Sequence, residues 1–537
     1  MRASAASAPA VLPSAIGTPA DTRALWLLAG ITLLGGALRL FHLGAQPLWT
    51  DEAFSWRWAH LTLGELWGSH AILETNPPLY YTLQKLLLPL GESEATLRLL
   101  AAIFGTLTVP LVFLLGRLVG GTVAGLVAAA LLATSPIHIA YSQEARGYTL
   151  LMAGATLAVW GMLRFFQDAA PAHQRDEPAG SSIALGAYAA GTTIALYCHN
   201  TAVFLWLFAN LAAVLWWLGE TGRSRRFALL WVAANLVPLA LYLFWVPVVV
   251  IQALYDPGTS IGWMVQPGPR EALMWVARIY GQRYFPVLQP YGAAFLTWPV
   301  FLLLAGWAWW RWPERRPLVA VLLLFVAGVP LLTWGTGLVL RPLLQERTLL
   351  WPLGLWLVLV AVGIALIRSP ARRGLALAAV LLVQLSGLAF YYGTDRKLPW
   401  DEVVAVIARD HLPDDGFVVT PLPGHWTFGY YASRVGLPHR DHVVWVAKPP
   451  VPEYPNIDVS DRGTDFMPPA GLGALRERYA RLWVAIEKGR RQDPERQIEA
   501  MLRRIGRIVR QRTYTDDLEL MLVELAPMPP PALTPGG

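Results

Sequence analysis

Long apolar segments alternate with short polar stretches along the chain up to about residue 393. Eleven of these segments have about the 17–25 residues that a helix needs to cross a bilayer. They lie at about 24–43, 95–115, 122–139, 148–167, 182–198, 201–218, 227–251, 291–310, 317–339, 348–367 and 374–393. The pattern predicts an α-helical polytopic membrane protein with about eleven transmembrane helices.

Basic residues between the segments predict the orientation. They follow the second, fourth, sixth, eighth and tenth segments and flank the first, at Arg2, Arg23, Arg117, Arg175, Arg223, Arg225, Arg226, Arg311, Arg315, Arg316, Arg368, Arg372 and Arg373. If the N-terminus is inside, threading eleven spans places all of them on one side. By the positive-inside rule that side is the cytoplasm, so the chain is predicted to be N-in and C-out.

The predicted topology divides the chain into four parts. Residues 1–23 form a cytoplasmic tail and 527–537 a second tail, both predicted to be disordered because they are short, terminal and largely Pro-rich. Residues 24–393 form the transmembrane module. Its outer loop, 44–94, contains an amphipathic pattern at Phe54, Trp58 and Leu61 and the short apolar run 79–90, so it is predicted to carry interfacial helices.

The composition changes at about residue 394. Helical patterns at 401–412 and 491–503 alternate with short strand patterns at 416–420, 442–447, 481–486 and 518–525. Residues 394–526 are therefore predicted to form an α/β domain outside the membrane. Its Trp426, Tyr430 and Tyr431 are either core residues or a platform for a sugar, and we expect the domain to cover the acceptor groove or to bind an envelope partner.

Composition agrees with the membrane class. Hydrophobic residues make up 55% of the 537 residues and charged residues 15%, and the mean hydropathy is +0.43. The net charge of +7 comes from Lys and Arg dispersed between apolar segments, which is the pattern of membrane topology and not of nucleic-acid binding. The single cysteine, Cys198, excludes an intramolecular disulfide.

An acidic pair, Asp51-Glu52, stands just beyond the first apolar segment. Holding ionised carboxylates near hydrocarbon costs free energy, so the pair is expected to interact with a partner such as a proton, a cation or a hydroxyl. The alternative is that Thr50 or Asp51 caps a helix over about 53–67.

Other polar groups fall on the same predicted face, and each has a purely structural alternative. Pro77-Pro78 after Asn76 suits a stiff turn that starts a helix. Glu144 and Arg146 suit a loop ion pair, Arg341 and Arg347 suit contacts with phospholipid, and His199 suits an interfacial position. The convergence of groups from distant segments favours a functional site.

Four runs on this face closely resemble the C-fold glycosyltransferases that use polyprenyl-phosphate sugars. In particular they look like the bacterial branch related to protein O-mannosyltransferases and the lipid A aminoarabinose transferase. The runs are Trp49-Thr50-Asp51-Glu52-Ala53, Asn76-Pro77-Pro78-Leu79-Tyr80-Tyr81, Ser93-Glu94-Ala95 leading to Leu97-Arg98-Leu99, and Ser135-Pro136 through Tyr141-Ser142-Gln143-Glu144-Ala145-Arg146-Gly147-Tyr148. The resemblance covers order, spacing and sidedness over roughly residues 24–350.

The resemblance implies sugar transfer from a polyprenyl-phosphate donor to a cell-envelope glycan, lipid or protein, at the outer face of the inner (plasma) membrane. Asp51 is then the catalytic base or the carboxylate that orients the acceptor, with Glu52 and Glu144 as further catalytic acids. Arg341, Arg347 and Arg146 are assigned to the donor phosphate, although relatives often show an Arg-Tyr pair where this chain has Arg347-Thr348. Candidate substrate contacts are Asn76, Tyr80, Tyr81, Gln143, Tyr148 and His199.

The chemistry of the residues supports these roles for the carboxylates and the arginines. Glycosyl transfer needs an activated hydroxyl, stabilisation of an oxocarbenium-like centre and neutralisation of the leaving phosphate, which two carboxylates and a guanidinium provide. A single displacement, with inversion, is predicted because no third carboxylate is placed as a nucleophile.

Two questions stay open at this level. Asp51, Glu52 and Glu144 are candidate ligands for a divalent cation such as Mg²⁺ or Mn²⁺, although no tight metal-binding spacing is present. The alternative functions are an envelope-modifying transferase that does not move a sugar, and a transporter or flippase of lipid-linked sugars. A transporter is expected to place its charged residues near mid-span rather than at span ends.

Overall fold

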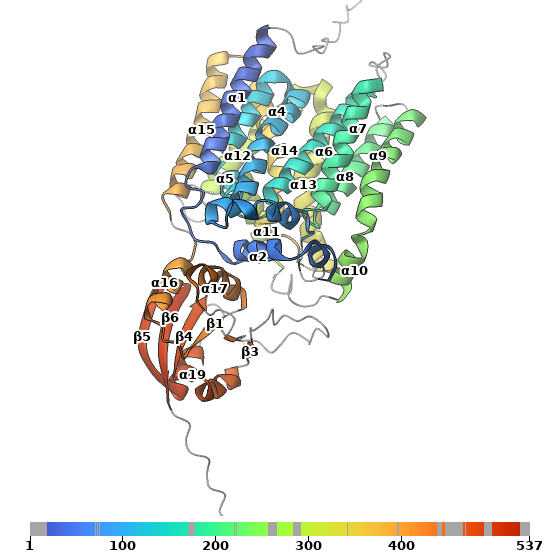
Figure 1. Ribbon diagram of the computed structural model, residues 1–537. Coiled ribbons are helices and arrows are strands. Elements are labelled where there is room, and N and C mark those ends of the chain that lie inside the picture. The colour runs from blue at the N-terminus through green and yellow to red at the C-terminus, as the bar shows by residue number, and fades with distance from the viewer. Residues whose placement is uncertain are drawn as a thin grey trace, which may run out of the picture.

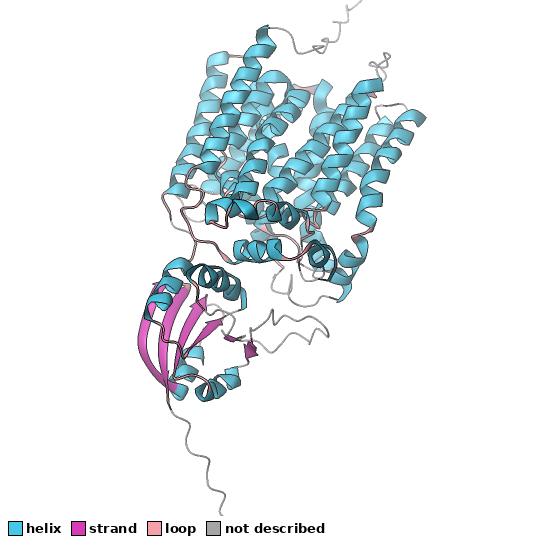
Figure 2. Cartoon of the chain, viewed as in Figure 1, coloured by secondary structure: helices cyan, strands magenta, loops and turns pink. Residues whose placement is uncertain are grey.

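The computed structural model describes most of the chain. The described residues are 19–69, 71, 74, 76–169, 178–219, 221, 223–255, 266–282, 292–340, 342–394, 397–420, 422–437, 443–445, 465–467, 469–487 and 497–526. The tails predicted to be disordered lie almost entirely outside this range, as does Arg341. The molecule consists of a helical bundle and a sheet-containing domain at one end of it (Figures 1 and 2).

Long apolar helices build the bundle (Figure 1). They are α1 (Pro19–Leu40), α4 (Glu94–Ala133), α6 (Tyr148–Asp168), α7 (Pro178–Leu196), α8 (Ala202–Gly219), α9 (Arg225–Leu243), α12 (Gly292–Arg311), α13 (Arg316–Val339), α14 (Leu350–Ala365) and α15 (Pro370–Tyr392). Within the described residues, eight helical segments are long and apolar enough to cross a membrane. The chain is therefore a multi-pass membrane protein, and the count of eleven spans stays a prediction. Helix α14 lies at the centre of the bundle, and its residues from 350 to 364 are all buried.

Helix α4 contains a reversal at Gly121, whose φ of 80° lies in the left-handed region that glycine adopts without strain. A Cβ atom on Gly116 would lie 2.9 Å from Cα of Gly125, so the two parts of α4 pack against each other. The reversal separates the segments predicted at 95–115 and 122–139. The second part ends before Ser135-Pro136, because proline cannot continue the hydrogen-bond ladder, and α5 (Pro136–Ser142) follows as a separate helix that overlaps the end of the segment predicted at 122–139.

Glycines allow α6 and α7 to approach closely. A Cβ atom on Gly161 would lie 2.5 Å from the carbonyl oxygen of Ala184, and one on Gly191 would lie 2.5 Å from that of Gly154. Small residues are used in this way where membrane helices pack without a hydrophobic driving force between them.

Short helices gather between the bundle and the C-terminal domain (Figure 1). They are α2 (Thr50–His60), a π-helical turn (Glu65–Ser69), α3 (Leu79–Lys85), a 3-10 turn (Leu88–Leu90), α5, α10 (Val246–Tyr255) and α11 (Pro269–Tyr280); 3-10 turns also precede α13 (Pro313–Arg315) and α14 (η5, Glu346–Leu349). The predicted amphipathic helix is thus present, but it begins at Thr50 and not near residue 53. Helix α11 lies between the spans predicted at 227–251 and 291–310.

The C-terminal domain contains one sheet with helices on both sides. Its elements are α16 (Trp400–Asp410), β1 (Asp415–Thr420), α17 (Leu422–Val435), β2 (Val443–Trp445), β3 (Asp465–Met467), a 3-10 segment (Pro469–Glu477), β4 (Arg481–Glu487), α19 (Gln497–Ile505), β5 (Gly506–Thr515) and β6 (Leu518–Leu525). The strand order is β3-β2-β1-β4-β6-β5, parallel from β3 to β4 and antiparallel at β6 and β5. The four predicted strands are present, whereas β3, β5 and α17 were not predicted.

Burial explains the order of the strands. The apolar strands β1 and β4 are buried along their length, as central parallel strands are. Strand β5 lies at the edge and carries exposed Arg507 and Arg512, and charged residues on an edge strand discourage pairing with another chain.

Helix α17 fixes the C-terminal domain to the end of the bundle that carries the short helices. The backbone N–H of Leu48 donates to the hydroxyl of Tyr431 at 2.8 Å, and the hydroxyl of Tyr430 donates to the carbonyl of Glu92 at 2.6 Å. The ring of Trp426 lies 5.5 Å from that of Phe54 in α2. These aromatic residues therefore form the interface between the two parts of the molecule.

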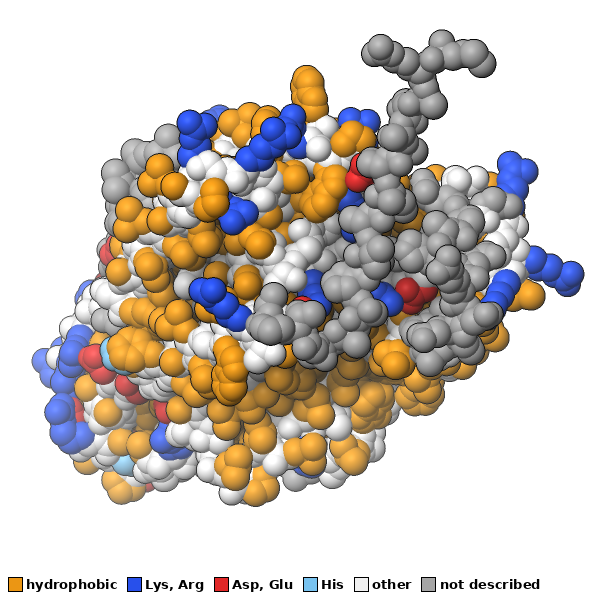
Figure 3. All heavy atoms as spheres, turned by 90° about the horizontal axis from the view of Figure 1, so that it is seen from above, with side chains coloured by type: hydrophobic (Ala, Val, Ile, Leu, Met, Phe, Trp, Pro, Cys, Tyr) orange, Lys and Arg blue, Asp and Glu red, His pale blue; other side chains and the backbone are white. Residues whose placement is uncertain are grey.

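The opposite end of the bundle carries those basic residues used to predict the orientation that the structure describes, whereas Arg2 and Arg175 lie outside the described residues. Figure 3 looks onto this end and shows Lys and Arg side chains spread among hydrophobic ones. Arg117 pairs with Asp21 near the start of α1 at 3.3 Å, and Arg315 donates to the carbonyl of Leu118 at 3.4 Å. Residues from three predicted cytoplasmic stretches therefore lie together.

Candidate active site

Asp51 and Arg347 meet at the end of the bundle that faces the C-terminal domain. Asp51 lies in the first turn of α2, and Arg347 lies in η5, directly before the central helix α14. Oδ2 of Asp51 and Nη1 of Arg347 are 2.6 Å apart, and the side chains are 25% and 18% exposed. The pair is thus held on rigid elements and remains partly accessible.

Arg146 is a second guanidinium beside Asp51. Its Nη1 donates to the hydroxyl of Tyr81 at 3.0 Å and lies 3.4 Å from the backbone carbonyl of Asp51. Its Nη2 lies 3.5 Å from Oε1 of Glu74. The segment before α6 therefore brings a cation to the same place as α2 and η5.

Glu74 organises this part of the site, and the sequence interpretation missed it. Its Oε1 accepts hydrogen bonds from the amide Nδ2 of Asn76 at 2.7 Å and from the hydroxyl of Tyr81 at 2.9 Å. Its backbone carbonyl accepts from Nε2 of Gln252 at 2.7 Å. Two of the predicted substrate contacts, Asn76 and Tyr81, are thus tied to Glu74, whose only sequence signal is its position just ahead of Asn76-Pro77-Pro78.

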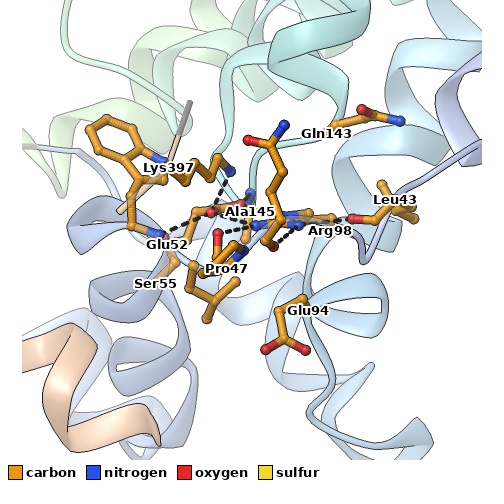
Figure 4. Close-up of polar contacts among 12 residues, drawn as sticks. Leu43, Pro47, Glu52, Ser55, Glu94, Arg98, Gln143, Ala145 and Lys397 are labelled. Carbon is orange, nitrogen blue, oxygen red and sulfur yellow. Dashed lines mark hydrogen bonds and ion pairs between the residues drawn. The ribbon is translucent and has the colours of Figure 1, made fainter. Parts of the chain in front are cut away.

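Glu52 lies at the centre of a closed ion-pair cluster (Figure 4). Arg98 donates to both of its oxygens, at 2.7 and 2.9 Å, and Nζ of Lys397 donates to Oε2 at 2.6 Å. The backbone N–H of Ala145 donates to Oε1 at 3.0 Å, and that of Trp49 to Oε2 at 3.3 Å. Glu52 thus reaches back to the residue before α2, and it has no exposed surface.

The two cations of this cluster were not assigned from the sequence. Burial raises the pKa of Glu52, but Arg98 and Lys397 outweigh burial and lower it to about 2. Burial lowers the pKa of Lys397 to about 8, although Glu52 opposes this change. The sequence offers a signal for Arg98, because a charged residue near the start of an apolar helix is expected to have a partner. No local sequence pattern indicates a role for Lys397, which lies beyond the last helix of the bundle.

Arg98 also fixes the chain that leads into α2. Its Nη1 and Nη2 donate to the backbone carbonyls of Leu43 at 2.9 Å, of Gln46 at 2.8 Å and of Pro47 at 2.8 Å (Figure 4). The segment that carries Asp51 is therefore held from α4 through Arg98 and from the C-terminal linker through Lys397.

Gln143 connects structural elements rather than facing an open space. Its Nε2 donates to the backbone carbonyls of Arg39 at 3.0 Å and Phe41 at 2.6 Å, and its Oε1 accepts from the hydroxyl of Tyr391 at 2.8 Å. Both ends of the amide are occupied, so the residue joins α1 and α15 to the segment around Glu144.

The remaining predicted substrate contacts lie near the two arginines. Tyr80 is buried and packs against Gly147. A Cβ atom added to Gly147 would lie 3.1 Å from the Cβ atom of Tyr80. The ring of Tyr148 lies 6.3 Å from that of His199. Burial, with Arg347 and Arg146, lowers the pKa of His199 to about 3, so this imidazole is neutral; its Nδ1 accepts from the backbone N–H of Thr201 at 3.1 Å.

A cavity of about 690 Å³ lies between the bundle and the C-terminal domain. Thr50, Glu144 and Arg347 line it from the membrane module, and Lys397 and Glu487 line it from the linker and from β4. Its volume is within the range of about 300–1,000 Å³ that is usual for ligand sites. The structure therefore places Glu144 and Arg347 at one cavity, next to Asp51.

The predicted metal ligands do not fit a metal ion as they stand. In the part of the chain that the structure describes, no group of three or more His, Cys, Asp or Glu side chains is arranged to hold one. Both oxygens of Glu52 are engaged by Arg98 and Lys397, so this carboxylate has no capacity for a cation. We therefore derive no step through a metal.

Comparisons with known proteins agree with the architecture. Residues 75–250 match the family model described as dolichyl-phosphate-mannose-protein mannosyltransferase. A comparison with curated proteins finds no match. Among solved structures, ArnT from Cupriavidus metallidurans in the apo state has a TM-score of 0.61 at 13% identity, over 94% of this chain and 98% of that one.

Two ligand-bound structures are also similar. ArnT from Cupriavidus metallidurans bound to undecaprenyl phosphate has a TM-score of 0.58 at 15% identity, over 94% of this chain and 98% of that one. The archaeal oligosaccharyltransferase AglB from Archaeoglobus fulgidus, in complex with an inhibitory peptide and a dolichol-phosphate, has a TM-score of 0.50 at 13% identity, over 93% and 74%. The resemblance to C-fold glycosyltransferases is thus confirmed: the chain has the fold of ArnT and AglB, and its residues 75–250 match the dolichyl-phosphate-mannose-protein mannosyltransferase family.

Proposed function

We propose that this protein is an integral-membrane glycosyltransferase that moves a sugar from a polyprenyl-phosphate donor to a hydroxyl group of a cell-envelope glycan, lipid or protein. The observation that carries this proposal is the convergence of one carboxylate, Asp51, with two guanidinium groups, Arg347 and Arg146, beside a cavity. Undecaprenyl phosphate and dolichol-phosphate are bound by the two similar proteins named above, which supports a lipid phosphate as the donor carrier.

Asp51 acts as the general base in this proposal. The acceptor oxygen attacks the anomeric carbon of the donor sugar, the bond from that carbon to the phosphate oxygen breaks, and the hydroxyl proton moves to the carboxylate of Asp51. Polyprenyl phosphate leaves with the bonding electron pair. A single displacement of this kind inverts the anomeric configuration.

Arg347 and Arg146 neutralise the phosphate. A guanidinium has five N–H donors, so Arg347 keeps its contact with Asp51 through Nη1 while other N–H groups bind phosphate oxygens. Arg146 is held in place by Tyr81 and Glu74.

Glu52 acts as a positioning residue. Its ion pairs with Arg98 and Lys397 fix the N-terminal turn of α2, and hence Asp51, against α4 and the linker. Glu144 lines the cavity and adds negative charge where the oxocarbenium-like centre develops. Tyr148 and His199 are proposed sugar contacts, and Arg341 is a further proposed phosphate ligand.

The site is proposed to face the outside of the plasma membrane. Eleven spans with the N-terminus inside place α2, η5 and the C-terminal domain on the outer face, and the basic residues of the opposite end on the cytoplasmic face. A lipid-linked donor is consistent with this location because it arrives already activated.

Reconstituted protein tests the proposal. Full-length protein in proteoliposomes is incubated with radiolabelled polyprenyl-phosphate mannose, glucose or galactose and with envelope extract, and transfer of label, release of polyprenyl phosphate and the anomer of the product are measured. The proposal predicts stoichiometric transfer and release with inversion for one donor. Movement of an intact donor across the bilayer without transfer favours a flippase, which the location of the charged residues at one end of the bundle does not support.

A further inference from the structure

The short segment 48–52, which carries Asp51, is held at both ends by groups from beyond the membrane bundle. At one end, the backbone N–H of Leu48 donates to the hydroxyl of Tyr431 in α17 at 2.8 Å. At the other end, Nζ of Lys397 donates to Oε2 of Glu52 at 2.6 Å (Figure 4). Asp51 therefore lies between two contacts that come from the C-terminal domain and from the linker that leads into it.

The hydroxyl of Tyr431 is fully used in this contact. While it accepts from Leu48, it donates to Oε1 of Glu94 at 3.1 Å. The side chain of Tyr431 is buried, and Leu48 has no exposed surface. A buried N–H without an acceptor costs free energy, so loss of this hydroxyl is expected to shift the backbone of the segment.

The apolar side chains that flank Asp51 belong to the core of the C-terminal domain. Leu48 and Ala53 lie in one hydrophobic cluster with residues of that domain, among them Trp400, Val403 and Phe417. The hydrophobic core of the bundle takes up α2 only further along, at Trp58. The start of α2 is thus packed into the C-terminal domain, and its later part is packed into the bundle.

Lys397 is fixed to the same domain. It stands shortly before Trp400, the first residue of α16, which is buried. The indole Nε1 of Trp400 donates to Oε2 of Glu487 at the end of β4 at 3.2 Å, and the backbone N–H of Trp400 donates to the carbonyl of Leu398 at 2.8 Å. The sheet of the C-terminal domain therefore sets the position of the ammonium group that meets Glu52.

We infer that the C-terminal domain positions the general base, and that Tyr431 and Lys397 are the positioning residues through which it does so. The domain is then a part of the catalytic machinery and more than a cover over the acceptor. This inference rests on the proposed function, because it concerns the placement of Asp51 in the same site. A base has to lie within hydrogen-bond reach of the acceptor hydroxyl, and a displacement of about 1 Å costs up to about 10²-fold in rate.

Two adjacent tyrosines provide a matched comparison. Tyr431→Phe removes the acceptor of the Leu48 N–H, whereas Tyr430→Phe removes a hydroxyl of the same helix that donates to the carbonyl of Glu92, outside the segment 48–52. Tyr431→Phe is expected to lower kcat about tenfold with an unchanged KM for the donor, because the proposed phosphate ligands are held by other elements. Tyr430→Phe is expected to keep both constants of the unmodified protein.

Lys397 gives a second, independent test. Lys397→Met leaves Glu52 with Arg98 as its cationic partner, and it is expected to lower kcat by about 10–10²-fold, again with an unchanged KM for the donor. Lys397→Arg keeps the positive charge and is expected to recover part of this loss. If Lys397→Met does not fold, the comparison of the two tyrosine variants still decides the question.

Hydrogen–deuterium exchange, measured by mass spectrometry on full-length protein in lipid nanodiscs, reports on the segment without any donor. Peptides that contain residues 48–52 are expected to exchange about tenfold faster in Tyr431→Phe and Lys397→Met than in the unmodified protein and Tyr430→Phe, as the loss of one hydrogen bond predicts. Peptides from α14 are expected to keep their rates in all variants.

The two levels of the argument can fail separately. Exchange and transfer in Tyr431→Phe and Lys397→Met that match those of Tyr430→Phe would overturn the inference, and so would faster exchange with unchanged transfer. Faster exchange confined to these two variants, in a protein that transfers nothing from polyprenyl-phosphate donors, would refute the proposed function and leave the anchoring of the segment by the C-terminal domain in place.

Discussion

Asp51 and Arg347 lie 296 residues apart in the sequence and form an ion pair with 2.6 Å between Oδ2 and Nη1. The carboxylate that we propose accepts the proton and the guanidinium that we propose binds the phosphate are thereby held together beside the cavity. This relationship, rather than the acidic pair Asp51-Glu52 itself, is the core of the site.

Replacing Arg347 tests its assignment to the donor phosphate. Arg347→Gln is expected to lower kcat/KM for the donor by about 10²–10³-fold, the effect of losing one preorganised charged donor. Arg347→Lys keeps the charge but loses the planar fork, so a smaller loss of about tenfold is expected. Steady-state transfer kinetics with Arg409→Lys, at an exposed position in the C-terminal domain, provide the control. Unchanged donor kinetics in Arg347→Gln would remove this assignment.

The cluster around Glu52 predicts a large effect on stability. Glu52→Gln leaves Arg98 and Lys397 buried without their carboxylate, which typically costs about 3–5 kcal/mol. The expected result is a clearly lower thermal midpoint in detergent, whereas Glu477→Gln, at an exposed position, is expected to behave like the unmodified protein. Equal midpoints for the two variants would show that the cluster contributes little to stability.

The same cluster predicts a pH dependence. Glu52 has a pKa of about 2 in the folded protein, below its ordinary value of 4.5. Because the folded-state pKa is the lower one, the contribution of Glu52 to stability is fully present above about pH 4.5 and is lost as the pH falls towards 2. The difference in thermal midpoint between the unmodified protein and Glu52→Gln is therefore expected to shrink over this range, and a constant difference from pH 6 to pH 2 would contradict the assignment.

Close packing of α6 on α7 predicts intolerance to a side chain at Gly161. Gly161→Val would place atoms on the backbone of α7 around Ala184 and Tyr188, so a loss of about 1–3 kcal/mol or more in stability is expected. The matched control is Gly186→Val, where a Cβ atom meets nothing within 4 Å. Thermal unfolding in detergent distinguishes the two, and similar midpoints would show that the helices can separate without cost.

Metal dependence is a further test. Since both oxygens of Glu52 are engaged by cationic side chains, transfer is expected to continue in EDTA and to be unaffected by added Mg²⁺ or Mn²⁺. Complete loss of transfer in EDTA, with recovery on adding Mn²⁺, would show that the carboxylates rearrange to bind a cation.

Much of the architecture could be predicted because membrane helices are marked by apolar length and basic flanks. The position of Asp51 beyond the first span, and of Arg347 before a late one, placed both on one face from sidedness alone. The family-like motifs added Glu144 and Arg146. Boundaries were less predictable. Pro136 divides a predicted span, and α11 lies between two predicted spans, where no helix was predicted.

The roles of Asp51 and Glu52 could not be separated from the sequence alone. Adjacent acidic residues look alike in a sequence, and only the partners distinguish them. Glu52 is buried because Arg98 and Lys397 reach it from α4 and from beyond α15. Lys397 has no local signal, since a lysine in a linker is usually exposed, and Glu74 is recognisable only through its hydrogen bonds to Asn76 and Tyr81.

Single-turnover transfer by Asp51→Asn shows whether Asp51 activates the acceptor. Donor binding and the thermal midpoint of each variant are measured in parallel, with Asp401→Asn, an exposed acid in α16, as the matched control. Asp51→Asn is expected to lower the rate of transfer by about 10²–10⁴-fold, as removal of a general base does, while the variant still folds and binds donor. Transfer at a near-normal rate by Asp51→Asn would contradict the account and would leave Asp51 as a partner of Arg347 only.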